Sequence, residues 1–182
     1  VDKEIASGLI SKELAEQEYF CSFDVGAATS YYATYINTMR LDGRIGEVPY
    51  DPSYPVNSVW DLGYSDSTFI ILYQVTKGGE VRIIDCYENN SLPLEHYIKV
   101  LSEKGQNWVW GKHYAPHDIA VHEFQTGLSR VEKARQHGFK FEMRDGKSAI
   151  PNIPIMEGIE AVRTTLPRTW IDERKCVPLI RA

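Results

Sequence analysis

The stretch VWDLGYSDSTFIILY, Val59–Tyr73, consists of two apolar runs separated by a short polar segment. Asp61 closes the first run, and Gly63 follows two places later. Aspartate and glycine are frequent turn residues, so a turn between two strands is one interpretation of this segment. A carboxylate at the end of a strand is also suited to bind a metal ion at the edge of a sheet. The stretch therefore predicts two consecutive strands and leaves both roles open for Asp61.

Further along the chain, strand-like patterns alternate with helix-like ones. Lys77-Gly78-Gly79 predicts a hairpin turn after the second strand, and Ser129 with Glu132 forms a capping box that predicts the start of a helix. An α/β fold follows, with a mixed five-stranded sheet flanked by helices. The expected strands are 55–61, 67–75, 80–87, 108–114 and 139–144, and the expected helices are 92–104, 129–138 and 155–166, followed by an extended piece over 169–172 and a helical start at 176.

The length of 182 residues, with 43% hydrophobic and 25% charged residues, predicts one globular domain. Residues 1–20 carry helix formers, whereas residues 21–52 read as irregular and rich in aromatic residues, glycine and proline. We therefore expect residues 1–53 to be a linker and residues 54–182 to be the domain. No apolar run of membrane length occurs in the sequence, and we expect no signal peptide. Three widely spaced cysteines suggest no zinc knuckle or disulfide framework, so a reducing, cytoplasmic location is expected.

The net charge of −5 argues against a surface covered with basic residues. The charge is uneven, however, because the segment 129–147 carries +3 and the remainder −8. This basic strip suits contact with a phosphate backbone, and an ordinary solvated helix face explains it equally well. Its basic residues are Arg130, Lys133, Arg135, Lys140, Arg144 and Lys147, against the acidic residues Glu132, Glu142 and Asp145.

Two aspartates follow strands that could be neighbours. Asp61 ends the first expected strand, and Asp118 comes directly after the fourth. If these strands are adjacent and parallel, both carboxylates emerge at the same edge, where a cation would relieve their repulsion. Hard oxygen ligands without a nearby cysteine favour Mg²⁺ or Mn²⁺, in an arrangement suited to two-metal phosphodiester hydrolysis. Asp66 fits a turn residue or a further outer ligand, and Asp85, inside a strand, is expected to be structural.

Other polar and aromatic residues admit simpler explanations. His113, His117 and His122 surround Asp118, but zinc requires three or four converging ligands, which their spacing does not favour. His117 fits better as an outer hydrogen-bonding group. The aromatic residues around Tyr31–Tyr35, with Trp108 and Trp110, could stack on bases, and core packing explains them better.

Five stretches of the sequence form a recognisable set: Glu16–Asp24, Tyr31–Val56, Val59–Thr68, His113–Phe139 and Gly158–Asp172. Together they resemble the nuclease domain of the large terminase subunit of tailed bacteriophages or prophages, the DNA-packaging motor. The resemblance implies a ribonuclease-H-like, resolvase-like fold that cleaves double-stranded DNA with Mg²⁺ or Mn²⁺ during genome packaging. It also implies as partners a terminase ATPase domain, a small terminase subunit and the portal or procapsid, in the bacterial host cytoplasm.

By position, Asp61 resembles the first-strand metal ligand of this family and Asp118 the second. The family's third acidic ligand, on a helix in a motif similar to His-x-Ala-Asp-Ala, has no match before Ala182. Asp172 and Glu173 precede the position of that helix, so we do not expect them to replace it. We therefore expect a domain that is incomplete at its C-terminal end and weakly active. No GxxxxGK[ST] loop is present, so the ATPase domain is expected to be absent and residues 1–53 to be its remnant.

Two other functions are compatible with the sequence. A non-catalytic module that docks on DNA or a procapsid would need no complete metal site. The pattern Asp-Leu-Gly followed by Ser and Thr before a strand also resembles the first phosphate loop of actin and sugar kinases. That fold needs a second half, for which 182 residues leave no room.

Overall fold

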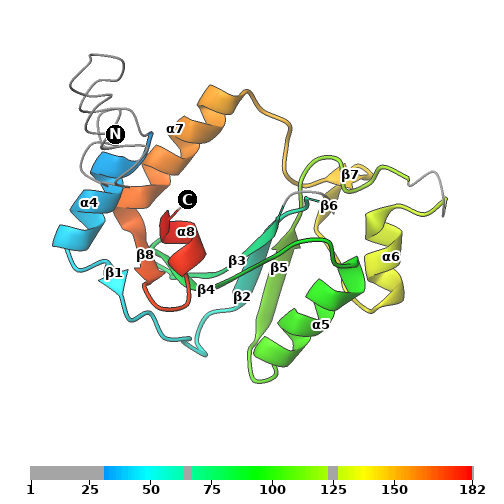
Figure 1. The fold of residues 1–182 in the computed structure, drawn as a ribbon, viewed down its shortest axis with the longest axis horizontal. Coiled ribbons are helices and arrows are strands. Elements are labelled where there is room, and N and C mark those ends of the chain that lie inside the picture. Colours follow the sequence, from blue (N-terminus) through cyan, green and yellow to red (C-terminus); the bar gives the residue numbers. More distant parts are fainter. Residues whose placement is uncertain (1–30, 64–66, 123–126, 182) are drawn as a thin grey trace, which may run out of the picture.

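The computed structural model describes residues 31–63, 67–122 and 127–181 and contains a six-stranded mixed sheet in the order β1-β8-β4-β3-β2-β5 (Figure 1). The two central pairs, β2 with β3 and β3 with β4, are antiparallel, whereas the outer pairs are parallel. The strands are β1 (Ile45–Gly46), β2 (Val56–Asp61), β3 (Thr68–Val75), β4 (Val81–Asn89), β5 (Trp110–Tyr114) and β8 (Thr169–Asp172).

The helices gather at two opposite ends of the sheet. Figure 1 shows α5 and α6 near β5, whereas α4, α7 and α8 surround β8. The helices are α4 (Ala33–Leu41), α5 (Leu94–Lys104), α6 (Arg130–Gln136), α7 (Ile155–Thr165) and α8 (Val177–Arg181), with a 3₁₀ turn over Leu166–Arg168. None of the helices within the described ranges is long and apolar enough to cross a membrane.

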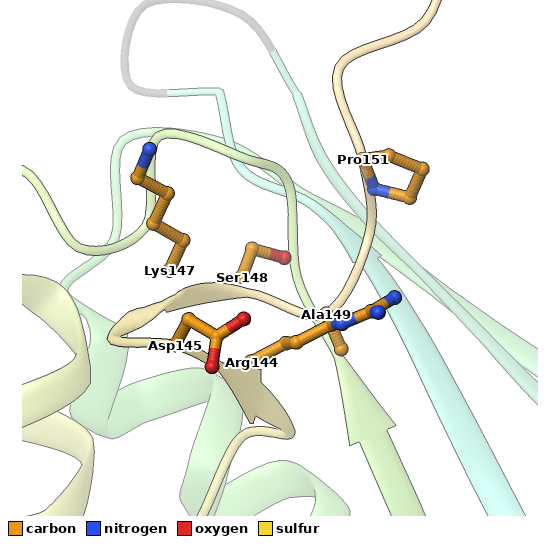
Figure 2. A pocket seen from close by; sticks show the side chains of 6 residues that line it. All are labelled: Arg144, Asp145, Lys147, Ser148, Ala149 and Pro151. Atoms are coloured by element: carbon orange, nitrogen blue, oxygen red, sulfur yellow. The ribbon is translucent and has the colours of Figure 1, made fainter.

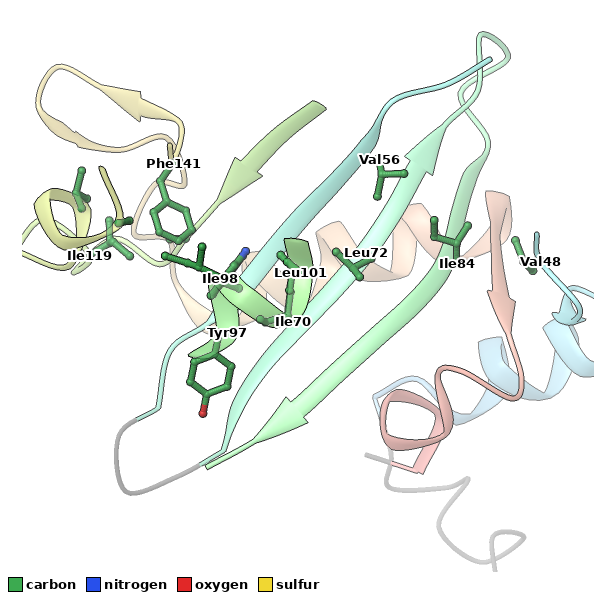
Figure 3. Close-up of a cluster of buried hydrophobic side chains, with 14 residues drawn as sticks. Val48, Val56, Ile70, Leu72, Ile84, Tyr97, Ile98, Leu101, Ile119 and Phe141 are labelled. Atoms are coloured by element: carbon green, nitrogen blue, oxygen red, sulfur yellow. The ribbon is translucent and has the colours of Figure 1, made fainter. Parts of the chain in front are cut away.

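The β2–β3–β4 meander forms because its residues alternate between the two faces. In β3, residues 68, 70, 72 and 74 are buried, and the intervening ones are only half-buried or exposed. Gly79 closes the β3–β4 turn with a φ of 81°, and its N–H donates to the carbonyl of Thr76. Ile98 and Leu101 of α5 pack on Ile70 of this meander (Figure 3). The expected hairpin and the helix over 92–104 are therefore confirmed.

The expectation of a fifth strand over 139–144 is wrong. This segment leaves the α6 helix at Gly138, and its two phenylalanines pack against Trp60, at ring-centroid distances of 5.4 and 5.2 Å, instead of continuing a ladder. It contacts β5 through one backbone bond, from Glu142 N–H to the carbonyl of His113. It then forms a separate two-stranded hairpin of β6 (Met143–Arg144) and β7 (Lys147–Ser148).

The main sheet has six strands because two other short segments join it. The extended piece over 169–172 is β8, which pairs with β4, and Ile45–Gly46 is β1, which pairs with β8. The expectation that residues 21–52 are irregular is wrong for β1 and for α4. The α4 sequence ATYINTMRL has several β-branched residues and no side-chain cap, so packing around buried Met39, not local propensity, stabilises it. The helix expected over 1–20 lies outside the described residues.

Arg44 ties this N-terminal part of the domain to β8. Its guanidinium donates to the carbonyls of Leu166 and Thr169, at 2.8 and 3.1 Å, and pairs with Asp42 at 3.0 Å. Its own carbonyl accepts from Ile171 N–H. The guanidinium thereby links the start of the 3₁₀ turn after α7 with the first residue of β8.

Asp85 is structural, as expected, and its partner is Lys104. The Asp85 side chain is 9% exposed, and its Oδ2 lies 2.7 Å from Nζ of Lys104 at the last residue of α5. A carboxylate removed from water needs such a counter-charge, since an unpaired buried charge is costly.

Lys104→Met should lower the free energy of unfolding by about 2–3 kcal/mol, because it leaves the Asp85 carboxylate buried and unpaired. Asp85→Asn in addition should restore part of that loss. Urea unfolding measures both effects. Lys99→Met, on the exposed side of the same helix, is the matched control and should change stability by less than about 0.5 kcal/mol. Equal effects of the two methionine variants would contradict this role of the ion pair.

Candidate functional site

The parallel pairing of β2 with β5 brings Asp61 and Asp118 to the same edge of the sheet. Ser58 is in register with His113, and Val59 with Tyr114. Asp61 lies two residues beyond Val59, and Asp118 four residues beyond Tyr114, in the same direction. Both side chains are exposed. The expectation that these two strands are adjacent and parallel is therefore confirmed.

Buried neighbours position each aspartate. Trp60, 2% exposed, precedes Asp61, and the Asp61 backbone pairs with Phe69 of β3. Asp118 lies in a turn between Ala115 and Ile119, which are 1% and 0% exposed. Because the residues on both sides are held in the core, the turn presents its carboxylate to solvent from a rigid base.

Two backbone bonds and one side-chain bond define the Asp118 turn. Ile119 N–H donates to the carbonyl of Pro116 at 3.1 Å, and Val121 N–H donates to that of Asp118 at 2.9 Å. The hydroxyl of Ser148 donates to the carbonyl of Ala115. The β6–β7 hairpin is thereby fixed against the segment that carries Asp118.

The segment after Asp61 bears on the two roles that the sequence left open for this residue, in a turn or as a metal ligand. The Thr68 hydroxyl donates to the carbonyl of Gly63 at 2.9 Å and closes the connection between β2 and β3. Asp66, the other candidate ligand in this connection, lies outside the described residues. A turn and an exposed terminal carboxylate thus occur together, so the two interpretations of Asp61 do not exclude each other.

Side chains fix the register between β2 and β5. The ladder is irregular between Val56 and Ser58, and there Asn57 Oδ1 accepts from Lys112 N–H at 2.9 Å in place of a backbone carbonyl. One residue on, Ser58 Oγ lies 2.8 Å from His113 Nδ1 and accepts from Trp60 Nε1 at 2.7 Å. The Ser58 hydroxyl thus accepts from the indole and also pairs with the imidazole of His113.

His113 is half-buried and packs against aromatic side chains at the margin of the core. Its ring lies 4.2 Å from that of Phe139 and 5.3 Å from that of Trp110. Burial lowers the pKa of His113 to about 4, and the neighbouring Glu142 opposes this shift only in part. The imidazole is therefore neutral near pH 7.

The remaining histidines do not form a zinc site. His117 is exposed, and His122 pairs with Glu132 at 3.5 Å. Across residues 31–63, 67–122 and 127–181, no group of three or more histidine, cysteine or acidic side chains could hold a metal ion. Trp108 and Trp110 are partly buried against the core, in agreement with packing instead of base stacking.

Asp172 is distant from this edge and has a structural role. It lies on β8, separated from β2 by β4 and β3. Its carboxylate accepts from the N–H groups of Val48, Arg174 and Lys175 at 2.9–3.1 Å. Burial opposes these bonds, but together they hold the pKa of Asp172 below its usual value. These bonds occupy its oxygens, which supports the expectation that Asp172 does not replace a third ligand.

Asp61 and Asp118 fit Mg²⁺ or Mn²⁺ as a partial ligand set. They supply hard oxygen donors from two rigid strand ends and are open to solvent. Magnesium is commonly held by one or two carboxylates and keeps several waters, so two such residues are a sufficient protein contribution to one ion.

The basic strip divides between α6 and the β6–β7 hairpin. Arg130 and Lys133 lie on α6, and Lys147 lies on β7. Arg135 of α6 and Gly146 of the hairpin line one shallow depression together with His122, which shows that the two elements are neighbours. Arg130, Lys133 and Lys147 thus belong to one region next to the Asp118 turn.

The hairpin presents its cations in different directions. Arg144 and Lys147 line a hollow of about 400 Å³ with Ser148 and Pro151, and Figure 2 shows the two side chains extending away from each other. They therefore do not converge on one small anion. Separated cations on a turn suit successive phosphates of a nucleic-acid backbone better.

Sequence reasoning missed several residues of this region. Arg144 was counted in the basic strip but not singled out, although it is exposed on the same hairpin as Lys147. Ser148 and Asn57 had no visible signal, because each acts through a contact with a distant segment. The dipeptide Asp145-Gly146, with φ values of 52° and 75°, is the signal that could have located the hairpin.

Comparisons with known proteins agree with this geometry at the level of the fold. The sequence matches no protein-family model and no curated protein sequence significantly. Among solved structures, the P22 large terminase nuclease domain is similar over 75% of this chain and 71% of its own, with 14% identity and a TM-score of 0.55. The large terminase of a thermophilic bacteriophage, in complex with ADP, is similar over 76% of this chain and 33% of its own, with 14% identity and a TM-score of 0.57.

The chain is thus an α/β protein with the ribonuclease-H-like fold of terminase nuclease domains. It spans about one third of the large terminase from the thermophilic bacteriophage. At 14% identity the similarity concerns the fold, and the site rests on this chain's own residues.

The neutral His113 predicts a pH-dependent stability. Below about pH 6.5 the unfolded histidine binds a proton, whereas the folded one stays neutral down to about pH 4. The unfolded state therefore binds more protons in this range, and stability present above pH 6.5 is lost as the pH falls toward 4. The loss attributable to His113 should be on the order of 2 kcal/mol.

His113→Gln keeps an acceptor for Ser58 but does not titrate. Urea unfolding of both proteins from pH 7 to 4 should show the wild type losing stability relative to the variant as the pH falls. A stability difference that stays constant across this range would contradict a neutral, half-buried His113.

Proposed function

We propose that this chain is a metal-dependent endonuclease domain that cleaves double-stranded DNA during viral genome packaging. The observation that carries the proposal is the parallel β2–β5 pairing, which places Asp61 and Asp118 at one edge of a terminase-type nuclease fold. In this role the two aspartates hold Mg²⁺ or Mn²⁺. Bound divalent ions would supply an activated water and stabilise the leaving oxygen.

The protein's own contribution is to hold two carboxylates rigidly in an open position. Trp60 anchors Asp61, and Ala115 and Ile119 anchor Asp118, while both carboxylates remain exposed. A double helix is too wide to enter a deep cavity, so a site for duplex DNA has to be open in this way. The exposed sheet edge meets that requirement.

The basic strip is the proposed contact with the DNA backbone. Arg130 and Lys133 on α6, and Lys147 with Arg144 on the hairpin, lie next to the Asp118 turn. Positive charge beside the aspartates would compensate for the repulsion between a phosphate backbone and an acidic protein. As in terminases, the proposed partners are an ATPase domain, a small terminase subunit and the portal or procapsid, in the bacterial host cytoplasm.

A non-catalytic docking module is the second candidate. One observation favours it: the described residues contain no group of three potential metal ligands. In that case the basic strip binds DNA, and the two aspartates bind no metal. The binding of Mn²⁺ separates the two functions.

Asp61→Asn and Asp118→Asn should each weaken Mn²⁺ binding on the order of tenfold, because each removes one charged oxygen ligand. Titration calorimetry of the 182-residue chain with MnCl₂ measures this without requiring turnover. Cleavage of supercoiled plasmid with Mn²⁺, where it occurs, should fall in parallel. The matched control is Asp145→Asn. Asp145 is exposed and has a left-handed backbone conformation, which asparagine also adopts readily.

Equal Mn²⁺ affinity in the wild type and both site variants would contradict the metal site. DNA binding retained alongside that result would favour the docking module.

Replacing Arg130 and Lys133 by glutamate should weaken duplex DNA binding and flatten its salt dependence, since each lost phosphate contact reduces the slope of log K against log[salt] by about 0.9. Lys147→Glu should act in the same direction. Fluorescence anisotropy at several NaCl concentrations measures the slope. Lys77→Glu, in the exposed β3–β4 turn at the other end of the strands from Asp61, is the control. An unchanged slope of log K against log[salt] in the α6 variant would show that the strip is an ordinary solvated face.

A further inference from the structure

Two cysteines from distant parts of the chain meet at the end of the sheet opposite to β5. Cys86 lies on β4 and Cys176 directly before α8; they are 6% and 0% exposed. Both thiols are free and belong to one buried cluster. The Cys86 thiol donates to the carbonyl of Lys175 at 3.3 Å, the residue immediately before Cys176. Each of the two thiols shifts the pKa of the other.

The pair is chemically asymmetric. The hydrogen bond from Cys176 lowers the pKa of Cys86, although burial opposes this shift. The same hydrogen bond, together with burial, raises the pKa of Cys176. Cys86 is therefore the thiol that ionises first, and it also retains the larger contact with solvent.

We propose that Cys86 and Cys176 are a peroxide-reactive pair that closes into a disulfide between β4 and the start of α8. The geometry carries this assignment, because the Cys86 thiol bonds to the carbonyl directly before Cys176 and both cysteines lie in one buried cluster. Neither the candidate nuclease site nor the basic strip uses these residues, so the proposal is independent of the proposed function.

The reaction balances with one hydroperoxide. The Cys86 thiolate attacks one peroxide oxygen, the O–O bond breaks, and the departing hydroxide takes a proton to become water, which leaves a sulfenic acid on Cys86. The Cys176 thiol then loses its proton while its sulfur attacks the Cys86 sulfur. The S–O bond breaks, and the second hydroxide leaves as water with that proton. Two thiols are oxidised by two electrons, and the peroxide is reduced.

The disulfide would fix a weakly held helix. None of the residues of α8 is buried, and the helix contacts the core through the half-buried Leu179 and Ile180. Cys176 joins it to β8 through its N–H bond to the carbonyl of Asp172. A covalent bond to β4 would add a cross-link across about ninety residues of chain, which restricts the unfolded state.

The test is treatment of the 182-residue chain with stoichiometric hydrogen peroxide, followed by peptide mass mapping without reduction. We expect a Cys86–Cys176 cross-linked peptide, a loss of about 2 Da in monomeric protein, and a rise in Tm of about 5 °C that dithiothreitol reverses. Cys21→Ser, which removes the third cysteine, should behave as the wild type does. Cys86→Ser and Cys176→Ser should each abolish both the mass loss and the Tm shift.

Three results would overturn the proposal: disulfides that involve Cys21 only, oxidation of Cys86 to sulfinic acid without a cross-link, or no oxidation at all. Because the mapping uses the wild type, the test holds even if a serine variant does not fold.

Discussion

The parallel alignment of β2 with β5 is the constraint on which the site depends. Parallel strands have no connecting turn to set their register, so side chains must do so. Here Asn57 replaces a ladder acceptor for Lys112, and Ser58 links His113 to Trp60. A shift of one residue would exchange the faces of β5 and move Asp118 away from Asp61. The buried polar network therefore ties the stability of the core to the position of two exposed carboxylates.

The two ends of the sheet differ in whether their polar side chains are exposed or buried. At the β5 end, α5 packs on the meander, whereas α6 and the β6–β7 hairpin lie beside the Asp118 turn and carry the basic strip. At the β8 end, Arg44, Asp172 and the cysteine pair satisfy or bury polar groups among α4, α7 and α8. Acidic residues occur at both ends. At the β8 end Asp172 is buried and its oxygens accept backbone N–H groups, whereas Asp61 and Asp118 at the other end are exposed. This contrast, more than the number of aspartates, is what makes one edge a candidate site.

An overall negative charge is compatible with the proposed DNA-directed function because the charges are segregated. Most of the chain carries −8, which disfavours indiscriminate contact with a polyanion. The +3 of residues 129–147 is concentrated on α6 and the adjacent hairpin. Attraction is thereby limited to one side of the acidic edge, so a duplex bound there would be aligned relative to Asp61 and Asp118.

Local patterns in the sequence determined the meander from β2 to β4, the helices α5, α6 and α7, and the strand ends that carry Asp61 and Asp118. Alternation, the Gly78-Gly79 turn and the Ser129 capping box depend on neighbouring residues and are therefore visible without a structure. Only the tertiary structure decided that β1 and β8 join the sheet, that the 139–144 segment leaves it, that His113 is neutral at the margin of the core and that Cys86 meets Cys176. Each of these depends on contacts between segments far apart in the chain, whose free energy no local pattern records.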